Sequence, residues 1–573
     1  MRSTILLGLL GAMAFLIPAT DASTFLKRSL NEWRDDLEKP DRPDLRRSAA
    51  FALGQIGAPA GVAIDKLIDH AKNDKDPGVR EMAARAVGDI VAGIRTTGKS
   101  EREWAIAGKA LEAALKDTDP RVRRSAAYAL GSFGDLASES TPALRVALRD
   151  KTPTVRQNAA WAIGKMGDPG EETVRELCSL LGDDSPLVRR LTAGALAEVT
   201  EKKEKKPPEV ALALMKMLKK EEDDVVCRTG LGALARIADE TMRKQASDLY
   251  RLLEDSKDPE TVRATAFVLA KMGGEPAMRA VPVLCKALAD PDPGVQMKAA
   301  ASLANAGSAA HLGVEALAET LGRSKNVQVR RNCVVALGLI NQALRSDRSP
   351  RIDRTAPVAL AALMKAIEVK PATEDDAYVA RVKEQVREDA VEAIANIGYP
   401  NNEKAFPLIV VLLREEKNQN LRMRCVWAVS SCHELDRHDD IKKALLEVLD
   451  ETSAMTVNVR LNAARYIALS LREKAPDRTT KVLLDMLGNT GLKVRYGSET
   501  SVDGIGTEGK AGGARVTMRW GGDARYMAAE ALGWMGSKLK DDAKVKKALE
   551  AAAKDPDPKL SMEAKKALEA IEK

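Results

Sequence analysis

The sequence predicts an all-α solenoid, a stack of helical hairpins, and three observations support this fold class. One short pattern recurs along the chain, its apolar residues follow a helical period, and aromatic residues are scarce. Hydrophobic residues make up 45% of the 573 residues but aromatic residues only 3%, so the core should consist mainly of Ala, Leu, Val and Ile. Such a composition is typical of packed helices.

The recurring pattern is clearest at 117–135, DTDPRVRRSAAYALGSFGD, and it returns at 152–168 as TPTVRQNAAWAIGKMGD. We number each copy from the position of Val122, which is offset 0. Fourteen copies, mostly 33 to 38 residues apart, then start at Leu45, Val79, Val122, Val155, Val188, Val226, Thr261, Val295, Val329, Val386, Leu421, Val459, Ala524 and Leu560. One copy cannot bury its apolar face alone, so the copies must stack.

Each copy has the signals of a helix with a defined start. Offsets 0, 4, 8 and 11 fall on one helical stripe. In one copy this stripe holds Val122, Ala126, Leu130 and Phe133. The pair Asp119-Pro120 supplies an N-cap carboxylate and a proline suited to the first turn. An apolar helix precedes each copy, for example at 171–184, so the repeating unit is a helical hairpin.

Small residues mark two further positions of the repeat. Offset 12 should hold the left-handed residue that ends the helix, and it is glycine in seven copies: Gly57, Gly134, Gly167, Gly273, Gly307, Gly398 and Gly536. Offset 9 is Gly, Ala or Ser in thirteen of the fourteen copies. A side chain kept this small lets a neighbouring helix approach closely.

The sequence Asp-Pro-x-Val-Arg followed by Ala-Ala-x-Ala-Leu-Gly-x-x-Gly, complete at Asp119–Gly134, resembles the short HEAT repeats of bilin lyases and many bacterial proteins. The resemblance covers roughly 25–573 and implies a right-handed α-α superhelix of the HEAT/armadillo type, with about 14 helical hairpins. It also implies a scaffold that binds other molecules, because this family serves mainly that purpose. The chemistry of the bilin lyases is not implied, since the resemblance lies in the repeats alone.

The resemblance further implies a ladder in which the residue at offset 1 pairs with acidic residues between repeats. This position is arginine in ten copies: Arg46, Arg80, Arg123, Arg156, Arg189, Arg330, Arg387, Arg422, Arg460 and Arg525. It departs from the pattern at Cys227, Val262, Gln296 and Ser561. We therefore expect these arginines to be structural, and the middle of the chain to be weaker or differently curved.

The sequence divides into four segments. Residues 1–22 are expected to be a signal peptide, because Arg2 precedes the apolar stretch Ile5–Ile17 and a small-residue cleavage site ends at Ala22. Residues 23–487 are the solenoid, and 524–573 are the final repeats with a polar C-terminal cap. The segment 488–523 between them is glycine-rich, with LKVRY and ARVTMRW on either side of a polar middle, which predicts a β-hairpin-like insertion.

The composition argues against several classes of function. The net charge of +7 is too small for a dedicated nucleic-acid binder. Only four histidines occur, and the cluster CHELDRHDD at 432–440, which contains His433, is better explained by a core cysteine and a helix end than by a metal site. No nucleophile motif is present. We expect no catalytic residues, no metal, no cofactor, no disulfide and no membrane span after signal cleavage.

A candidate binding surface lies on the second helix of each hairpin. Offsets 2 and 6 project away from the apolar stripe, toward the concave side of the solenoid or its rim, and they carry arginines and aromatic rings. The candidate residues are Arg47, Phe51, Arg124, Tyr128, Trp161, Arg190, Arg228 and Phe267. Exposed aromatic residues with arginine are typical of binding hot spots. Alternatively, these rings pack on neighbouring helices and the arginines are merely solvated.

The sequence thus predicts a non-catalytic, secreted or periplasmic scaffold that binds a protein or peptide along the concave face. The alternative is a binder of an anionic polymer, such as an acidic polysaccharide, through the arginine and aromatic residues. The two hypotheses differ in their salt dependence, because charge-dominated binding weakens as ionic strength rises.

Overall fold

The computed structural model describes residues 24–94, 101–167, 169–201, 207–430, 432, 435–451, 453, 456–489, 493–495, 499–501, 515–517 and 520–573. The expected signal peptide at 1–22, His433 and the middle of the insertion at 502–514 lie outside these residues. The chain forms two compact units. The first runs to Ala238 and includes Ser247–Ala264, and the second comprises Asp239–Ala246 and Thr265–Lys573.

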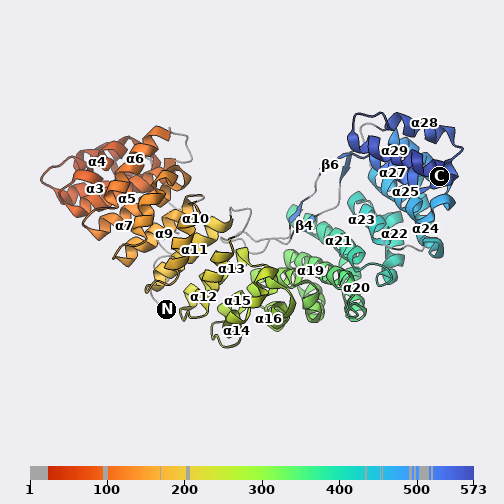
Figure 1. Ribbon diagram of the computed structural model, residues 1–573, viewed down its shortest axis with the longest axis horizontal. Coiled ribbons are helices and arrows are strands. Elements are labelled where there is room, and N and C mark those ends of the chain that lie inside the picture. The colour runs from red at the N-terminus through yellow and green to blue at the C-terminus, as the bar shows by residue number, and fades with distance from the viewer. Residues whose placement is uncertain are drawn as a thin grey trace. The chain divides into compact units, whose positions relative to one another are not determined.

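The first unit consists of paired helices (Figure 1). Its helices are α2 (Leu30–Leu37), α3 (Pro43–Ile56), α4 (Ile64–Asn73), α5 (Pro77–Ile94), α6 (Glu101–Ala114), α7 (Pro120–Phe133), α8 (Thr141–Ala147), α9 (Pro153–Lys165), α10 (Glu171–Leu180), α11 (Pro186–Glu201), α12 (Pro208–Leu218), α13 (Asp224–Ile237) and α14 (Ser247–Glu254). The division between the units falls within α15 (Pro259–Met272). It lies in the stretch where the ladder arginine is replaced by Cys227 and Val262.

The second unit continues the same pattern. Its helices are α16 (Gly274–Ala287), α17 (Pro293–Asn305), α18 (Val314–Arg323), α19 (Val327–Ser346), α20 (Ile352–Glu368), α21 (Ala377–Ile397), α22 (Phe406–Glu415), α23 (Gln419–Ser430), α24 (Asp439–Leu449), α25 (Val457–Leu471), α26 (Asp477–Leu487), α27 (Arg525–Trp534), α28 (Ala543–Ala552) and α29 (Pro558–Glu572). Every one of the fourteen sequence copies coincides with the second helix of a hairpin, from α3 to α29, so the predicted repeat is confirmed.

Short strands occur at two places. Near the N-terminus β1 (Thr24–Phe25) pairs with β2 (Arg28–Ser29), which the sequence did not predict. In the glycine-rich insertion β3 (Lys493–Arg495) pairs antiparallel with β6 (Trp520–Asp523), and β4 (Glu499–Ser501) pairs antiparallel with β5 (Arg515–Thr517). The expected β-hairpin-like insertion is therefore present as two successive antiparallel pairs.

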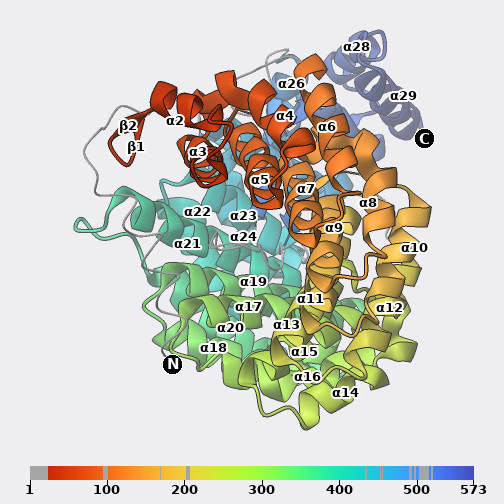
Figure 2. The same ribbon diagram turned by 90° about the vertical axis from the view of Figure 1, so that its left-hand side faces the viewer.

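The hairpins stack so that second helices pack on second helices. In the first unit α3, α5, α7, α9, α11 and α13 contact one another in that order, and they lie side by side in Figure 2. The small residue at offset 9 makes this contact close. A Cβ added at Gly88 on α5 would lie 2.6 Å from the Cα of Ala129 on α7, and one at Gly164 on α9 would lie 2.8 Å from that of Ala195 on α11. The expected close approach at this offset is confirmed.

The helix ends and the apolar stripe also agree with the sequence. Val122, Ala126, Leu130 and Phe133 are fully buried, and the Asp119 side chain accepts a hydrogen bond from the backbone N–H of Arg121 at the start of α7. All seven glycines at offset 12 have φ between 55° and 75°. This left-handed conformation ends each of those helices at low steric cost.

The arginine ladder joins successive hairpins. In the first unit Arg46, Arg80, Arg123, Arg156 and Arg189 each donate two hydrogen bonds to the carboxylate of the next hairpin, at 2.6–3.0 Å. The acceptors are Asp74, Asp117, Asp150, Asp183 and Glu221. Their second guanidinium edge donates to backbone carbonyls of the preceding interhelical turn. These arginines are structural, as the resemblance implied.

Candidate functional site

Two of the candidate surface residues, Tyr128 and Trp161, form a stacked pair of rings in the first unit. Tyr128 on α7 and Trp161 on α9 lie with ring centroids 5.4 Å apart and ring planes 10° apart. Both side chains are half-buried. The Trp161 ring leans toward α7, where a side chain at Gly131 would overlap it. Glycine at offset 9 of one helix thus makes room for the ring carried by the next.

Polar groups of α5 hold the Tyr128 ring in place. The Tyr128 hydroxyl donates a hydrogen bond of 3.1 Å to Oδ1 of Asp89. The Arg85 guanidinium carbon lies 5.3 Å from the centroid of the Tyr128 ring, and its Nε is 3.6 Å from the Asp89 carboxylate. Burial raises the pKa of Asp89. Burial and the nearby Asp89 carboxylate also raise the pKa of the Tyr128 phenol, so the hydroxyl remains a donor at neutral pH.

The second helix that follows α9 is α11, and these two helices pack on each other. The residue at the matching offset there is Gly194, and a Cβ added at Gly194 would meet no atom within 4 Å. The guanidinium of Arg190, one turn earlier on the same helix, forms no hydrogen bond or ion pair with any residue in the described part of the chain. The helix next to the one that carries Trp161 thus has open space at Gly194 and a guanidinium without a partner among the described residues at Arg190. We call Tyr128, Trp161, Arg190 and Gly194 the ring-pair surface.

The other candidate arginines are engaged within the chain. Arg47 lies 3.1 Å from Asp76, and Arg228 lies 2.5 Å from Asp258. Both aspartates come immediately before the second helix of the next hairpin. Arg124 pairs with Glu81 of the preceding hairpin. These contacts neutralise much of the positive charge that the sequence suggested for this surface. The aspartate of each Asp-Pro helix start was the sequence signal that could have revealed the pairing of Arg47 and Arg228.

Of the candidate aromatic residues, Phe267 is buried, whereas Phe51 is exposed as expected. Phe267 on α15 is only 9% exposed, so its predicted place on an exposed surface is wrong. An offset fixes the direction of a side chain from its own helix axis, but it does not reveal how far neighbouring segments cover it. Phe51 on α3 is 46% exposed, yet its ring packs edge-on against Phe25 of β1 with centroids 6.1 Å apart.

A buried ion cluster, which the sequence analysis missed, occupies the corresponding positions of the second unit. Arg331 on α19 donates to Asp389 on α21 at 2.7 Å, and Arg424 on α23 contacts Asp389 at 3.3 Å and also pairs with Glu392. Arg331, Asp389 and Arg424 are all buried. This part of the second-helix layer is therefore a packed interface between repeats. The sequence could have indicated this cluster, because arginine and acidic residues alternate at offsets 2 and 3 of successive copies.

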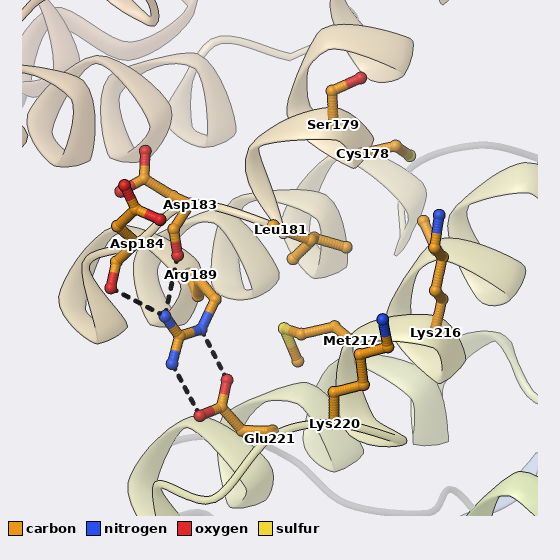
Figure 3. Close-up of a pocket in the computed structure, with 12 residues that line it drawn as sticks. Cys178, Ser179, Leu181, Asp183, Asp184, Arg189, Lys216, Met217, Lys220 and Glu221 are labelled. Atoms are coloured by element: carbon orange, nitrogen blue, oxygen red, sulfur yellow. Dashed lines mark hydrogen bonds and ion pairs between the residues drawn. The ribbon is translucent and has the colours of Figure 1, made fainter.

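A pocket of about 710 Å³ lies between α10 and α12 in the first unit (Figure 3). The ladder pair Arg189–Glu221 forms one wall, where the guanidinium also donates to the carbonyls of Asp183 and Asp184. Cys178 lies on the opposite wall, and burial raises the pKa of its thiol to about 11. This thiol is protonated at neutral pH and is not an activated nucleophile.

The described residues contain no group of three or more histidine, cysteine or acidic side chains that could hold a metal ion. Cys432 is buried, and its carbonyl accepts a hydrogen bond of 2.6 Å from the Tyr466 hydroxyl. All six cysteines are free thiols. In the described part of the chain, no helix combines the length and the apolar character that a bilayer crossing requires.

The stacked hairpins define the class of the protein, an α-solenoid repeat protein. The family model for HEAT repeats matches residues 30–101, 108–197, 141–235 and 246–338, which together make up just over half of the chain. The chain therefore belongs to the HEAT-repeat family. Comparison with curated proteins finds no match.

Solved structures of similar fold include two karyopherins. The importin-β Kap95p of yeast, from a structure of its complex with RanGDP, is 13% identical, with a TM-score of 0.50 over 95% of this chain and 72% of Kap95p. Kap121p, bound to the extreme C-terminus of the protein phosphatase Cdc14p, is 12% identical, with a TM-score of 0.51 over 99% of this chain and 59% of Kap121p. At these identities the likeness concerns the fold alone.

Proposed function

We propose that the protein is a non-catalytic scaffold that binds a protein or peptide partner on the second-helix layer, at the ring-pair surface. The observation that carries this proposal is the half-exposed Tyr128–Trp161 stack beside Gly194 and the free Arg190. A rigid aromatic anchor next to a guanidinium is the composition of an interface hot spot. Kap121p, which shares the fold, is a solenoid bound to a protein segment, and this supports the choice of partner class.

The pairing of the arginines favours a protein partner over an acidic polysaccharide. Arg47, Arg124 and Arg228 each have an acidic partner within the chain, so an anionic polymer would have to displace those carboxylates. A protein segment instead needs the apolar ring and one or two polar contacts. Support for a non-catalytic role comes from the raised pKa of the Cys178 thiol and from the structural engagement of the ladder arginines.

We further propose that the protein acts outside the cytoplasm. The support is the sequence of the first 22 residues, with Arg2, the apolar stretch Ile5–Ile17 and small residues before Ala22. N-terminal sequencing of the protein purified from cells tests this proposal. A mature chain that starts at Ser23 agrees with it, and a chain that keeps Arg2 contradicts it.

Affinity capture from the extracytoplasmic fraction tests the binding proposal. Wild-type protein is compared with the Tyr128→Ala/Trp161→Ala double variant, and bound protein is quantified after washes at about 50 mM and about 500 mM salt. We expect a protein that wild type retains at both salt concentrations and that the double variant loses. Equal recovery by both proteins overturns the proposal. Retention of polygalacturonate at the lower salt only would instead favour the polysaccharide alternative.

A further inference from the structure

The ladder changes at Arg330, the ladder arginine of α19. Each of the five ladder arginines of the first unit, from Arg46 to Arg189, forms an ion pair with a carboxylate near the C-terminal end of the first helix in the next hairpin. For Arg330 that first helix is α20, which ends at Glu368 with Val369 as its C-cap. The equivalent C-cap residues after α4 and α22 are Asp74 and Glu416, the partners of Arg46 and Arg387. Val369 therefore replaces the ladder acid.

The Arg330 guanidinium has no substitute partner. It forms no hydrogen bond or ion pair with any residue that the structure describes, whereas Arg387 on the next second helix donates to the Ile367 carbonyl and to Glu384 and Glu416. Burial lowers the pKa of Arg330. By contrast, the hydrogen bonds that they donate to their acidic partners raise the pKa values of the ladder arginines of the first unit, such as Arg123.

A pocket of about 250 Å³ opens beside this guanidinium, entirely within the second unit. It is lined by the last turn of α18, the first turn of α19, Val369 and one face of α21. Its charged lining residues are all basic: Arg323, Lys325, Arg330 and Lys383. Lys383 is held by Asp375 at 2.6 Å, and Arg323 donates to the Leu288 carbonyl at 2.8 Å. Arg330 and Lys325 remain without a partner among the described residues.

We propose that this pocket is a binding site for an oxyanion, either a carboxylate or a phosphate group, which the Arg330 guanidinium holds as the ladder arginines of the first unit hold their acids. The planar guanidinium presents paired N–H donors that match two oxygens of either group. The positive end of α19 and Lys325, which has no partner among the described residues, favour the negative charge further. The ligand takes the place that an aspartate or glutamate of the chain takes in the ladder of the first unit.

Two variants separate this proposal from a purely structural role. Arg330→Gln removes the guanidinium. Because this guanidinium has no partner among the described residues, the substitution breaks no hydrogen bond or ion pair within the described part of the chain. Val369→Glu restores the ladder acid at a position that is already 38% exposed, so the new carboxylate should occupy the oxyanion site while every basic residue stays in place. Arg175→Gln on α10, which removes an exposed arginine of the first unit, is the matched control.

Thermal unfolding and calorimetric titration with inorganic phosphate and with acetate, at ionic strength balanced by NaCl, provide the test. We expect a saturable rise in Tm of about 2 °C with wild type, the same rise with Arg175→Gln, and no rise with Arg330→Gln or Val369→Glu. A response to phosphate alone would assign a doubly charged ligand, and a response to both would assign a carboxylate-compatible site. No saturable response in wild type, or an unchanged response in Arg330→Gln or Val369→Glu, overturns the proposal.

Discussion

The indole ring of Trp161 on α9 lies over the phenol ring of Tyr128 on α7, and the hydroxyl of that phenol donates to Asp89 on α5. Three successive second helices are thus linked through side chains on the face opposite the buried stripe. The same contacts fix the orientation of the indole. A ring held in place in the free protein loses little conformational freedom when a partner binds, which lowers the entropic cost of binding.

The stack predicts energetic coupling between the two rings. Tyr128→Ala and Trp161→Ala should each destabilise the first unit, and the double variant should lose about 1 kcal/mol less than the sum of the two, because the stacking energy can be lost only once. Urea unfolding followed by circular dichroism measures the three free energies. Strict additivity would contradict the stacked geometry.

The close approach of second helices predicts opposite effects for two helical glycines. Gly88→Ala should lower the free energy of unfolding by about 1–3 kcal/mol, since the new Cβ would lie 2.6 Å from the Cα of Ala129. Gly194→Ala should raise it by about 0.5–1 kcal/mol, because nothing surrounds the new methyl group and alanine favours the helix. Thermal unfolding of both variants decides the matter. A stabilised Gly88→Ala protein would show that the helices are farther apart than described.

The ladder predicts a loss of stability in acid. Burial alone would raise the pKa of Asp74, but hydrogen bonds from Arg46, the backbone N–H of Asp76 and His70 lower it to about 2. The unfolded chain, with a pKa near 4, then binds the proton more tightly, so stability rises as the pH rises from about 2 to about 5. Asp74 should contribute about 2 kcal/mol above that range. Asp74→Asn should flatten the pH dependence of urea unfolding by that amount, and an unchanged slope would refute the assignment.

Ladder arginines with and without an acidic partner should contribute unequally to the free energy of unfolding. Arg123→Met leaves the part-buried Asp150 carboxylate and the carbonyls of Asp117 and Thr118 without their donor, and it should cost about 3 kcal/mol. Arg330→Met leaves no acceptor behind among the described residues and should cost less than about 1 kcal/mol. Chemical denaturation compares the two variants. Equal losses would mean that Arg330 has a structural partner.

The repeat architecture could be predicted from the sequence because each of its elements is local. Gly134 ends α7 with φ 57°, Asp119 caps its start, and Val122 through Phe133 fill its buried stripe, all within one helix. These features depend on the period of the helix and on the conformation of single residues. They do not depend on the neighbouring repeats.

The candidate surface was only partly predictable because it depends on contacts between repeats. The burial of Phe267 and the pairing of Arg124 with Glu81 across 43 positions reflect the packing of one hairpin on the next. Tyr128 and Trp161 could be placed on adjacent helices, but their stacking required the ring to lean over Gly131. The offset of a residue does not determine how far its side chain tilts toward a neighbouring helix.

The central claim, that a partner binds at the ring-pair surface, is tested most directly by a variant that blocks this surface without removing any contact. Gly194→Trp adds a ring where the backbone has open space, and Val146→Trp adds the same ring to α8 at a position that is 74% exposed. Capture from the extracytoplasmic fraction is quantified for both variants against wild type. We predict that Val146→Trp retains the partner and that Gly194→Trp loses it by at least about tenfold, or about 1.4 kcal/mol; equal capture by both variants would contradict the claim.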